Sequence, residues 1–575
     1  MTTPFSHNVP SPSNSGFEVG VQVIDRQVRF SQCIVWDLLE DFYRQQGINA
    51  WKSIPYGITN TVAIADTYAQ LFANWLADHV GQLDKNHPIY AIEAAAGVGQ
   101  FGYFFVRQLQ HYLAADKRLV DLNVITVITD FAQSIIDEWQ HNEKLAPFIK
   151  RGQLDIALFS PEYDQSLCLQ HANKTLKPDD FVNPCLVIGN YFFDSLRQDF
   201  FKIIDHRLHE VRVNTYRHVD TQGYNKPLSI ASLMIDECPL SLDTDAVAQY
   251  YPNPVHNHIL AQWAKDWEHH AFELPVGAFQ VIENLRRLTN DNLLLLMTDK
   301  GDVHPGIVKR FNHRVLDKHG EGFSFPVNFL AIQQLAEAHG GHVLLTHDEH
   351  LRLRTCWMDF SPMARQEGHG HNTTAFFERY LQETNLLNQV FSVYRWLTRA
   401  NTAMAQPKDS NTLANDEQDD VFMDFVGILQ LCQYDPWALQ LIDCYIGELA
   451  LTNSFRKHLL FNCMQRVEAN LYPSRNHIES YFLLATLYKL LDRYEDALRV
   501  INELLAAEPD HVDGLLLKAN LYHHLGNPSV IEVYHQCLQA MAADNPMRHD
   551  VENMITMLTA AMADMPEMAD SPKNA

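Results

Sequence analysis

The sequence predicts a doubly wound, mostly parallel α/β domain followed by an all-α region. Between residues 89 and 300, short apolar runs alternate with amphipathic stretches, as strands alternate with the helices that cover them. Beyond residue 420 the pattern is almost wholly helical and contains an internal repeat. The chain has 575 residues, which is more than one compact core supports, so we expect several domains.

Composition narrows the class of protein. The chain has 44 Lys and Arg against 70 Asp and Glu, and its net charge of −26 would repel nucleic acid and anionic lipid. Its nine cysteines are dispersed and form no CxxC pair, so we expect reduced thiols, and neither cysteines nor histidines show metal-site spacing. We expect no metal, and with no signal peptide or apolar span we expect a cytoplasmic protein.

Shifts in composition divide the chain into six segments. They are a flexible N-terminus (1–20), an α/β domain with a helical N-terminal part and an inserted hairpin (21–365), a helix with a polar linker (366–420), a helical region (421–475), helical repeats (476–545), and a helix with a disordered tail (546–575).

Periodicity places the elements of the α/β domain. Apolar residues at a spacing of three to four predict helices over Ala65–Val80 and Tyr103–Leu113. Five apolar runs predict parallel strands, namely Ile89–Ile92, Val124–Thr129, Leu154–Leu158, Cys185–Ile188 and Leu293–Met297.

Two further strand pairs are predicted to be antiparallel. Phe200–Ile204 and Leu208–Val213 flank a three-residue turn and predict an inserted hairpin. Val343–Thr346 and Leu351–Phe360 predict a closing pair at the end of the domain.

A repeat of 34 residues marks the C-terminal part. Residues of matching type recur at this period, with Tyr481, Ala485 and Tyr488 followed by Leu515, Ala519 and Tyr522. Small residues let paired helices approach closely while aromatic rings fill the gaps between them, which is typical of tetratricopeptide repeats. An ordinary helical hairpin is the alternative.

The strongest local signal is the segment 89–102. An apolar strand ends in Glu93, and a tight turn with Gly97 and Gly99 leads into a helix, so the backbone can approach a ligand closely. The glycines also satisfy the dinucleotide expression G-x-G-x-x-G, which leaves an NAD-dependent oxidoreductase as an alternative. However, a carboxylate at Glu93 disfavours phosphates and favours the ammonium group of S-adenosylmethionine.

Polar residues follow the neighbouring predicted strands. Asp130 ends the second strand and is placed to accept hydrogen bonds from ribose hydroxyls, and Asp155 in the third is placed to meet an adenine amino group. The fourth strand ends in the segment Asn190–Asp194. Because ligands of doubly wound sheets lie over the carboxyl ends of the strands, we expect these groups to converge on one crevice.

These motifs resemble those of class I S-adenosylmethionine-dependent methyltransferases, which have a Rossmann-like fold. The run Asn190-Tyr-Phe-Phe-Asp194-Ser-Leu196 is similar to the N-E-F-F-D-A-L signature of the MidA-like family. The resemblance as a whole covers roughly residues 40–360. Asp299-Lys300-Gly301 and Phe323–Phe329 follow in the order that the family shows.

The resemblance implies roles for individual residues. The residues expected to bind the cofactor are Glu93, Ala95, Gly97, Gly99, Asp130, Phe131, Asp155, Ile156 and Asn190. Asn190 and Asp194 are expected to be catalytic, the first by holding the substrate near the methyl group and the second by orienting a nucleophile or acting as base. Tyr191 and Phe193 are expected to contact the substrate.

Two positions depart from the family pattern. Ala95 replaces a glycine of the turn, and Tyr191 replaces a glutamate, which removes a bidentate partner for an arginine acceptor. Asp194 has a second interpretation as a helix N-cap, and Asp155 as a surface acid.

We therefore expect a methyltransferase (EC 2.1.1.-) that acts on a macromolecular acceptor. The tetratricopeptide-like helices are expected to hold that acceptor, a protein or peptide, on their concave surface. The alternative is a catalytically degenerate methyltransferase fold that serves as a protein-interaction scaffold.

Overall fold

The computed structural model describes most of the chain. The described residues are 20–52, 59–219, 227–303, 317–319, 322–347, 353–365, 370–383, 415–441, 446, 450–474 and 477–563. Most of the N-terminal segment, much of the expected linker and the last twelve residues lie outside them.

A seven-stranded path forms the central sheet. Its strands run in the order β4 (Leu154–Leu158), β3 (Val124–Asp130), β2 (Ile89–Glu93), β7 (Cys185–Asn190), β12 (Leu293–Asp302), β17 (Leu353–Asp359) and β16 (His342–Leu345). The first five are mutually parallel, and β17 is antiparallel to both of its neighbours. The five predicted strands and the predicted closing pair are thus confirmed. The strand order reverses between β2 and β7, which makes this the switch point of the sheet.

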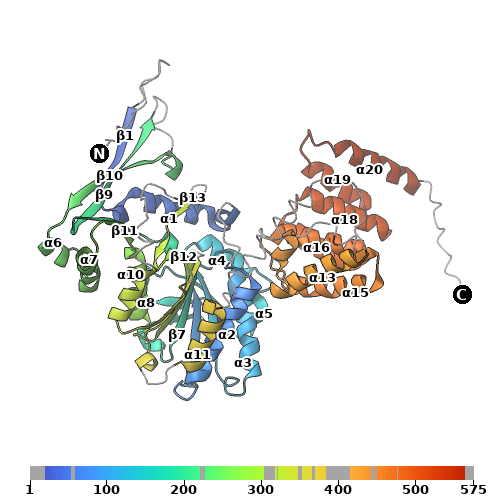
Figure 1. Ribbon diagram of the computed structural model, residues 1–575. Coiled ribbons are helices and arrows are strands. Elements are labelled where there is room, and N and C mark those ends of the chain that lie inside the picture. Colours follow the sequence, from blue (N-terminus) through green and yellow to red (C-terminus); the bar gives the residue numbers. More distant parts are fainter. Residues whose placement is uncertain are drawn as a thin grey trace.

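Helices cover both faces of this sheet (Figure 1). Alternate residues of the strands face opposite ways, so Leu294 packs in one core while Leu295 packs in the other. The helices of one face are α2 (Val62–His79), α3 (Gln100–Ala115), α4 (Gln133–Gln140) and α11 (His371–Phe376). Those of the other are α7 (Pro254–Asp266), α8 (Val276–Leu288) and α10 (Phe329–Ala338).

The predicted hairpin belongs to a second, five-stranded sheet. The hairpin strands β8 (Asp199–Ile204) and β9 (Arg207–Val219) are joined by β1, β10 and β11, at Gly20–Val28, Met234–Ser241 and His270–Leu274. Helix α1 (Ile34–Gln46) packs against this sheet through Trp36 and Leu39. The sequence predicted none of the three joining strands.

Shorter elements complete the α/β part. They are α5 (Ala146–Lys150), β5 (Leu167–Leu169), β6 (Lys174–Leu176), α6 (Thr244–Ala248), β13 (Asp317–His319), β14 (Gly322–Ser324) and β15 (Val327–Asn328).

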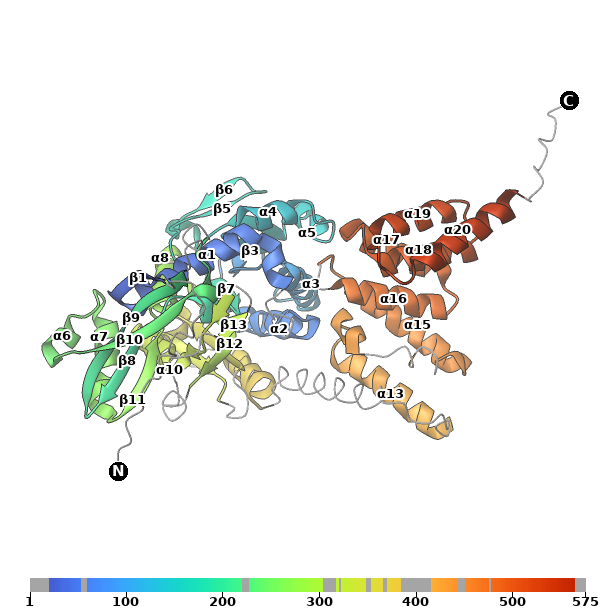
Figure 2. The ribbon, with the colours of Figure 1, turned by 90° about the horizontal axis from the view of Figure 1, so that it is seen from above.

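The C-terminal part consists of helices. They are α13 (Asn415–Leu431), α15 (Ser454–Glu468), α16 (Ile478–Leu490), α17 (Tyr494–Ala507), α18 (Val512–His524), α19 (Val530–Ala540) and α20 (Arg548–Ala563). Helices α16 and α18 begin 34 residues apart, and Tyr481, Ala485 and Tyr488 are buried in the shared core. Figures 1 and 2 both place this helical region beside the part of the molecule that carries α2 and α3. Among the described helices, none combines the length and apolarity that crossing a membrane requires.

Candidate functional site

The turn between β2 and α3 alternates between ordinary and left-handed backbone. Ala95, Gly97 and Gly99 have φ values of 52°, 55° and 75°. Glycine adopts such values without steric cost, whereas a residue with a Cβ is strained there. The turn therefore requires the glycines at 97 and 99, and Ala95 adopts the left-handed conformation at a steric cost.

Asp130 fastens this turn to the end of β3. Its Oδ2 accepts the Gly97 amide at 3.2 Å and its Oδ1 accepts the Ala132 amide at 3.0 Å. Burial raises the pKa of Asp130 to about 6, and the backbone amides partly oppose that rise. Each oxygen keeps a lone pair for a further donor.

Glu93 is a buried carboxyl group at the end of β2. Its pKa is raised well above the usual value, first by burial and then by the nearby Asp130 carboxylate, while the Gly102 amide opposes the rise. Glu93 Oε2 lies so close to α3 that a Cβ at Gly102 would be 2.6 Å from it. A cationic ligand beside these two acids would favour their ionised forms.

A small cavity of about 380 Å³ opens where β2 and β7 end. Glu93, Gly97, Asn60 and Asn190 contribute to its lining. The Asn60 Oδ1 and Asn190 Nδ2 atoms are buried and have no hydrogen-bond partner among the described residues. Both residues line the cavity, so these atoms are available to bond a polar ligand or a water molecule there.

The Asn190 side chain is fixed by a hydroxyl network that the sequence did not predict. Its Oδ1 accepts a hydrogen bond from the Tyr68 hydroxyl of α2 at 3.3 Å. That hydroxyl also contacts Thr298 of β12, whose Oγ1 lies 2.8 Å from the Oγ1 of Thr355 in β17. The periodicity of α2 marked Tyr68 only as part of an apolar face, which gave no sign of this contact.

A larger cleft of about 960 Å³, partly open to solvent, adjoins the small cavity, and Ala95 and Tyr191 line both. The turns after β3, β4 and β7 form its floor and helix α1 forms a wall. The residues that α1 contributes are Trp36, Leu39, Glu40 and Tyr43.

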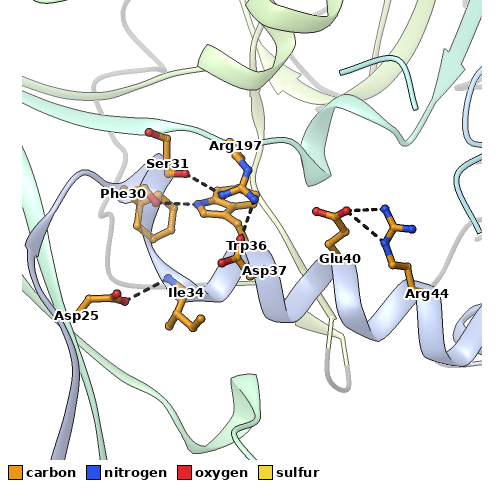
Figure 3. Close-up of polar contacts among 9 residues, drawn as sticks. All are labelled: Asp25, Phe30, Ser31, Ile34, Trp36, Asp37, Glu40, Arg44 and Arg197. Carbon is orange, nitrogen blue, oxygen red and sulfur yellow. Dashed lines mark hydrogen bonds and ion pairs between the residues drawn. The ribbon is translucent and has the colours of Figure 1, made fainter. Parts of the chain in front are cut away.

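Polar contacts hold the α1 wall in place (Figure 3). The Arg197 guanidinium donates to the Ser31 carbonyl at 3.0 Å and to Asp37 Oδ1 at 2.9 Å. Trp36 Nε1 donates to the Phe30 carbonyl at 2.8 Å. Because Arg197 follows β7, its two bonds tie the wall to the same segment that lines the cleft.

The segment after β7 is held by a buried acid of β12. The Asp299 Oδ2 atom accepts the Phe193 and Asp194 amides at 2.8 and 3.1 Å. Tyr191, also in this segment, has a φ of 47° and donates its amide to the Thr298 carbonyl. The side chain of Tyr191 lines both cavities, and the Lys300 ammonium lies 5.9 Å from its ring centroid.

Phe193 and Asp194 are placed differently from Tyr191. Phe193 is buried in the core, and Asp194 Oδ1 accepts a hydrogen bond from the Ser195 hydroxyl at 3.0 Å. Neither residue lines the small cavity or the cleft. No α-helix begins at Asp194, since 193–195 is one 3-10 turn, so the structure does not realise the helix-cap interpretation.

Asp155 and Ile156 do not converge with the strand-end acids. Asp155 stands near the start of β4, and its carboxylate accepts the amides of His171 and Ala172, both at 2.9 Å. Ile156 is fully buried in the core. Neither lines the small cavity or the cleft, which corrects the expectation of one common crevice.

Of the other predicted residues, Phe131 lines the cleft, where the Arg44 guanidinium lies 5.1 Å from its ring centroid. Gly99 is the N-cap residue of α3 and lines neither the small cavity nor the cleft. A Cβ at Gly99 would be 2.7 Å from Trp139 Nε1.

Glu162 is a cleft residue that sequence reasoning missed. Burial raises its pKa to about 7, with Arg197 lowering it and Glu40 raising it. A carboxyl group with such a pKa exchanges protons near neutral pH, as a general base does. Its position after β4 follows no motif, so only the fold brings it to the cleft.

Within the described residues, no group of three or more His, Cys, Asp or Glu side chains is arranged to hold a metal ion.

The sequence matches no protein-family model and no curated protein. Three solved structures from Burkholderia thailandensis are similar to it. An uncharacterized protein has 13% identity and a TM-score of 0.34, covering 56% of this chain and 73% of its own. A candidate methyl transferase bound to S-adenosyl-homocysteine has 13% identity and a TM-score of 0.37, covering 60% and 92%. An O-methyltransferase family protein has 11% identity and a TM-score of 0.22, covering 58% and 70%. Likeness at this level carries no inference about activity, which must be argued from the site.

Proposed function

We propose that this protein is an S-adenosylmethionine-dependent methyltransferase. The observation that carries the proposal is the set of polar groups at the switch point of the sheet. Glu93, Asn190 and Asp130 end three neighbouring strands around a left-handed turn, and a small cavity there opens beside a larger cleft. Ligands of doubly wound sheets bind at this place.

The groups present fit the parts of that cofactor. The Glu93 carboxylate suits an ammonium group, and the unpartnered Asn190 Nδ2 suits a carboxylate. Asp130, on the border of the cleft, keeps lone pairs for ribose hydroxyls, and the Phe131 ring offers an apolar surface for a base.

The residues of the cleft would support methyl transfer mainly by positioning and by excluding water. When bound, S-adenosylmethionine supplies a methyl group activated by a positively charged sulfur. Aromatic residues line the cleft together with Ala95, among them Trp36, Tyr191 and Phe192, and would exclude water from a bound acceptor. The Glu162 carboxylate is suited to take the proton that an acceptor nucleophile releases.

We further propose that the acceptor is a protein or peptide. The cleft is open to solvent on one side, which lets a side chain enter from a larger molecule. The paired helices α16–α19, with their 34-residue spacing, support a tetratricopeptide-like recognition surface for that molecule.

Transfer of labelled methyl groups tests this function. Purified protein incubated with methyl-labelled S-adenosylmethionine and co-purifying proteins should label one of them. The rate should rise with pH through about 7, because only ionised Glu162 accepts a proton. Glu162→Gln should lower the rate by about 10²-fold and remove that pH dependence.

The scaffold alternative makes the opposite prediction. A degenerate methyltransferase fold would bind the same co-purifying proteins, label none of them and show no difference between the wild type and Glu162→Gln.

A further inference from the structure

The C-terminal helical region contacts the segments that border the small cavity. The segment 469–474, between α15 and α16, lies against α3, and Tyr472 is buried in the core of the α/β part. Its ring centroid is 5.4 Å from that of Tyr103, and its hydroxyl accepts a hydrogen bond from Asn142 at 2.9 Å. A Cβ at Gly99 would be 3.1 Å from the same hydroxyl, so the helical region closes over the start of α3.

A chain of hydrogen bonds continues from this contact to the cavity lining. The Ser474 hydroxyl donates to Gln100 Oε1 at 3.2 Å. Gln100 Nε2 in turn donates to the carbonyl of Asn60 at 2.9 Å. Asn60 lines the small cavity beside Glu93, whereas Ser474 and Gln100 do not. Ser474, Gln100 and Asn60 are all buried.

A second contact holds the other side of the same segment. Asp435, in the helical region, accepts the Val62 amide at 2.8 Å, where α2 begins. Asp435 is buried, and its other oxygen accepts the Trp437 amide at 2.9 Å. Val62 is therefore bonded directly to the helical region, whereas Asn60 is linked to it through Gln100 of α3.

We propose that Ser474 and Asp435 are positioning residues, through which the helical region sets the shape of the small cavity. The ligand for which the cavity is shaped is the one given by the proposed function. The helical region is then a structural part of the cofactor site as well as a surface for partners. Ser474 acts through Gln100 and Asn60, and Asp435 acts through Val62.

A matched control is available in the same interface. Arg107 of α3 donates to the Ala469 carbonyl at 2.8 Å and to Asn470 Oδ1 at 2.5 Å. None of these three residues lines the small cavity. Arg107→Met thus weakens the docking of the helical region without breaking the chain that leads to Asn60.

The test uses the full-length protein and two readouts. Hydrogen exchange of the backbone amides over residues 59–65 is measured without ligand, and affinity for S-adenosylmethionine is measured by calorimetry. Ser474→Ala should accelerate the exchange and raise the Kd about three- to tenfold, which is the worth of one hydrogen bond. Gln100→Met, which breaks the same chain elsewhere, should reproduce both changes, and Arg107→Met should leave both within about twofold of the wild type.

Two results would overturn the proposal. One is unchanged exchange over residues 59–65 in both Ser474→Ala and Gln100→Met. The other is an equal change in Arg107→Met, which would show a general effect of docking. If the wild type itself does not bind S-adenosylmethionine, the proposed function fails, and the exchange measurement still decides whether Ser474 positions the segment.

Discussion

At the scale of single residues, Ala95 and Tyr191, the two positions that differ from the motifs the sequence resembles, coincide with backbone strain. Ala95 and Tyr191 both adopt left-handed φ values, and both line the small cavity and the cleft. Strained residues persist where the surrounding structure over-determines them, which is common at ligand sites. Here two buried acids hold the strained backbone. Asp130 accepts an amide from the turn that contains Ala95, and Asp299 accepts amides from the segment that contains Tyr191.

Replacing Ala95 with glycine should relieve this strain. Ala95→Gly is expected to raise the free energy of unfolding by about 1 kcal/mol, because the left-handed penalty of a Cβ disappears. Ala96→Gly is the matched control: Ala96 is outside the left-handed region, so the change should cost about 0.5–1 kcal/mol. Chemical denaturation measures both, and equal effects of the two changes would refute the strain.

The raised pKa of Asp130 predicts how affinity depends on pH. Its ionised form accepts two hydroxyl donors, and its pKa is about 6, so affinity for S-adenosylmethionine should rise between pH 5 and pH 7. The free energy of unfolding depends on pH with the opposite sign. A carboxyl group whose pKa is raised on folding binds more protons in the folded state, so its contribution to the free energy of unfolding falls as pH rises. Calorimetry of the wild type and Asp130→Asn across this range checks the first sign. If the affinity of Asp130→Asn rises with pH as steeply as that of the wild type, Asp130 is not the source of the pH dependence.

The sequence identified some site residues and misplaced others for a physical reason. Glu93, Asp130 and Asn190 stand at or beside the ends of their strands, where the pattern of a doubly wound sheet locates a ligand. Asp155 stands near the start of β4 and binds backbone amides, a difference that alternation along one short strand does not reveal. Glu162 and Tyr68 reach the site through tertiary packing, which leaves no local signal.

At the scale of elements, helix α1 is the part of the site that the strand pattern did not foresee. The sequence predicted a helical segment there, and the structure makes it the wall of the cleft through Arg197 (Figure 3). The strands β1, β10 and β11 were missed because their faces mix polar and apolar residues; Val21 and Val23 of β1, for example, are exposed. The apolar strands of the central sheet carry a stronger signal, since both of their faces are covered.

The link between α1 and the segment after β7 should control the titration of Glu162. Arg197 lowers the pKa of Glu162, so Arg197→Met should raise it and move the pH midpoint of methyl transfer above about 7. Arg118→Met serves as the control, since it removes an exposed pair with Asp116 and Arg118 does not line the cleft. A pH–rate profile that is the same in wild type and Arg197→Met would contradict this assignment of the base.

At the scale of the whole molecule, the helical region docks against the segments that border the small cavity. The sequence predicted the helices and their repeat from periodicity, because their apolar positions face one another within the region. It did not predict how the region docks, since Tyr472, Ser474 and Asp435 lie between helices and belong to no periodic pattern. The docking brings their contacts to α2 and α3, next to the small cavity.

The most direct test of the account is a calorimetric titration of S-adenosylmethionine into the wild type and Glu93→Gln, with thermal unfolding of both. Burial and the Asp130 carboxylate raise the pKa of Glu93, so its carboxyl group costs stability at neutral pH and the variant should unfold at a higher temperature. The same variant should bind about tenfold more weakly or worse, because the ammonium loses its charge partner. No binding by the folded wild type, or equal binding by Glu93→Gln, would contradict the central claim.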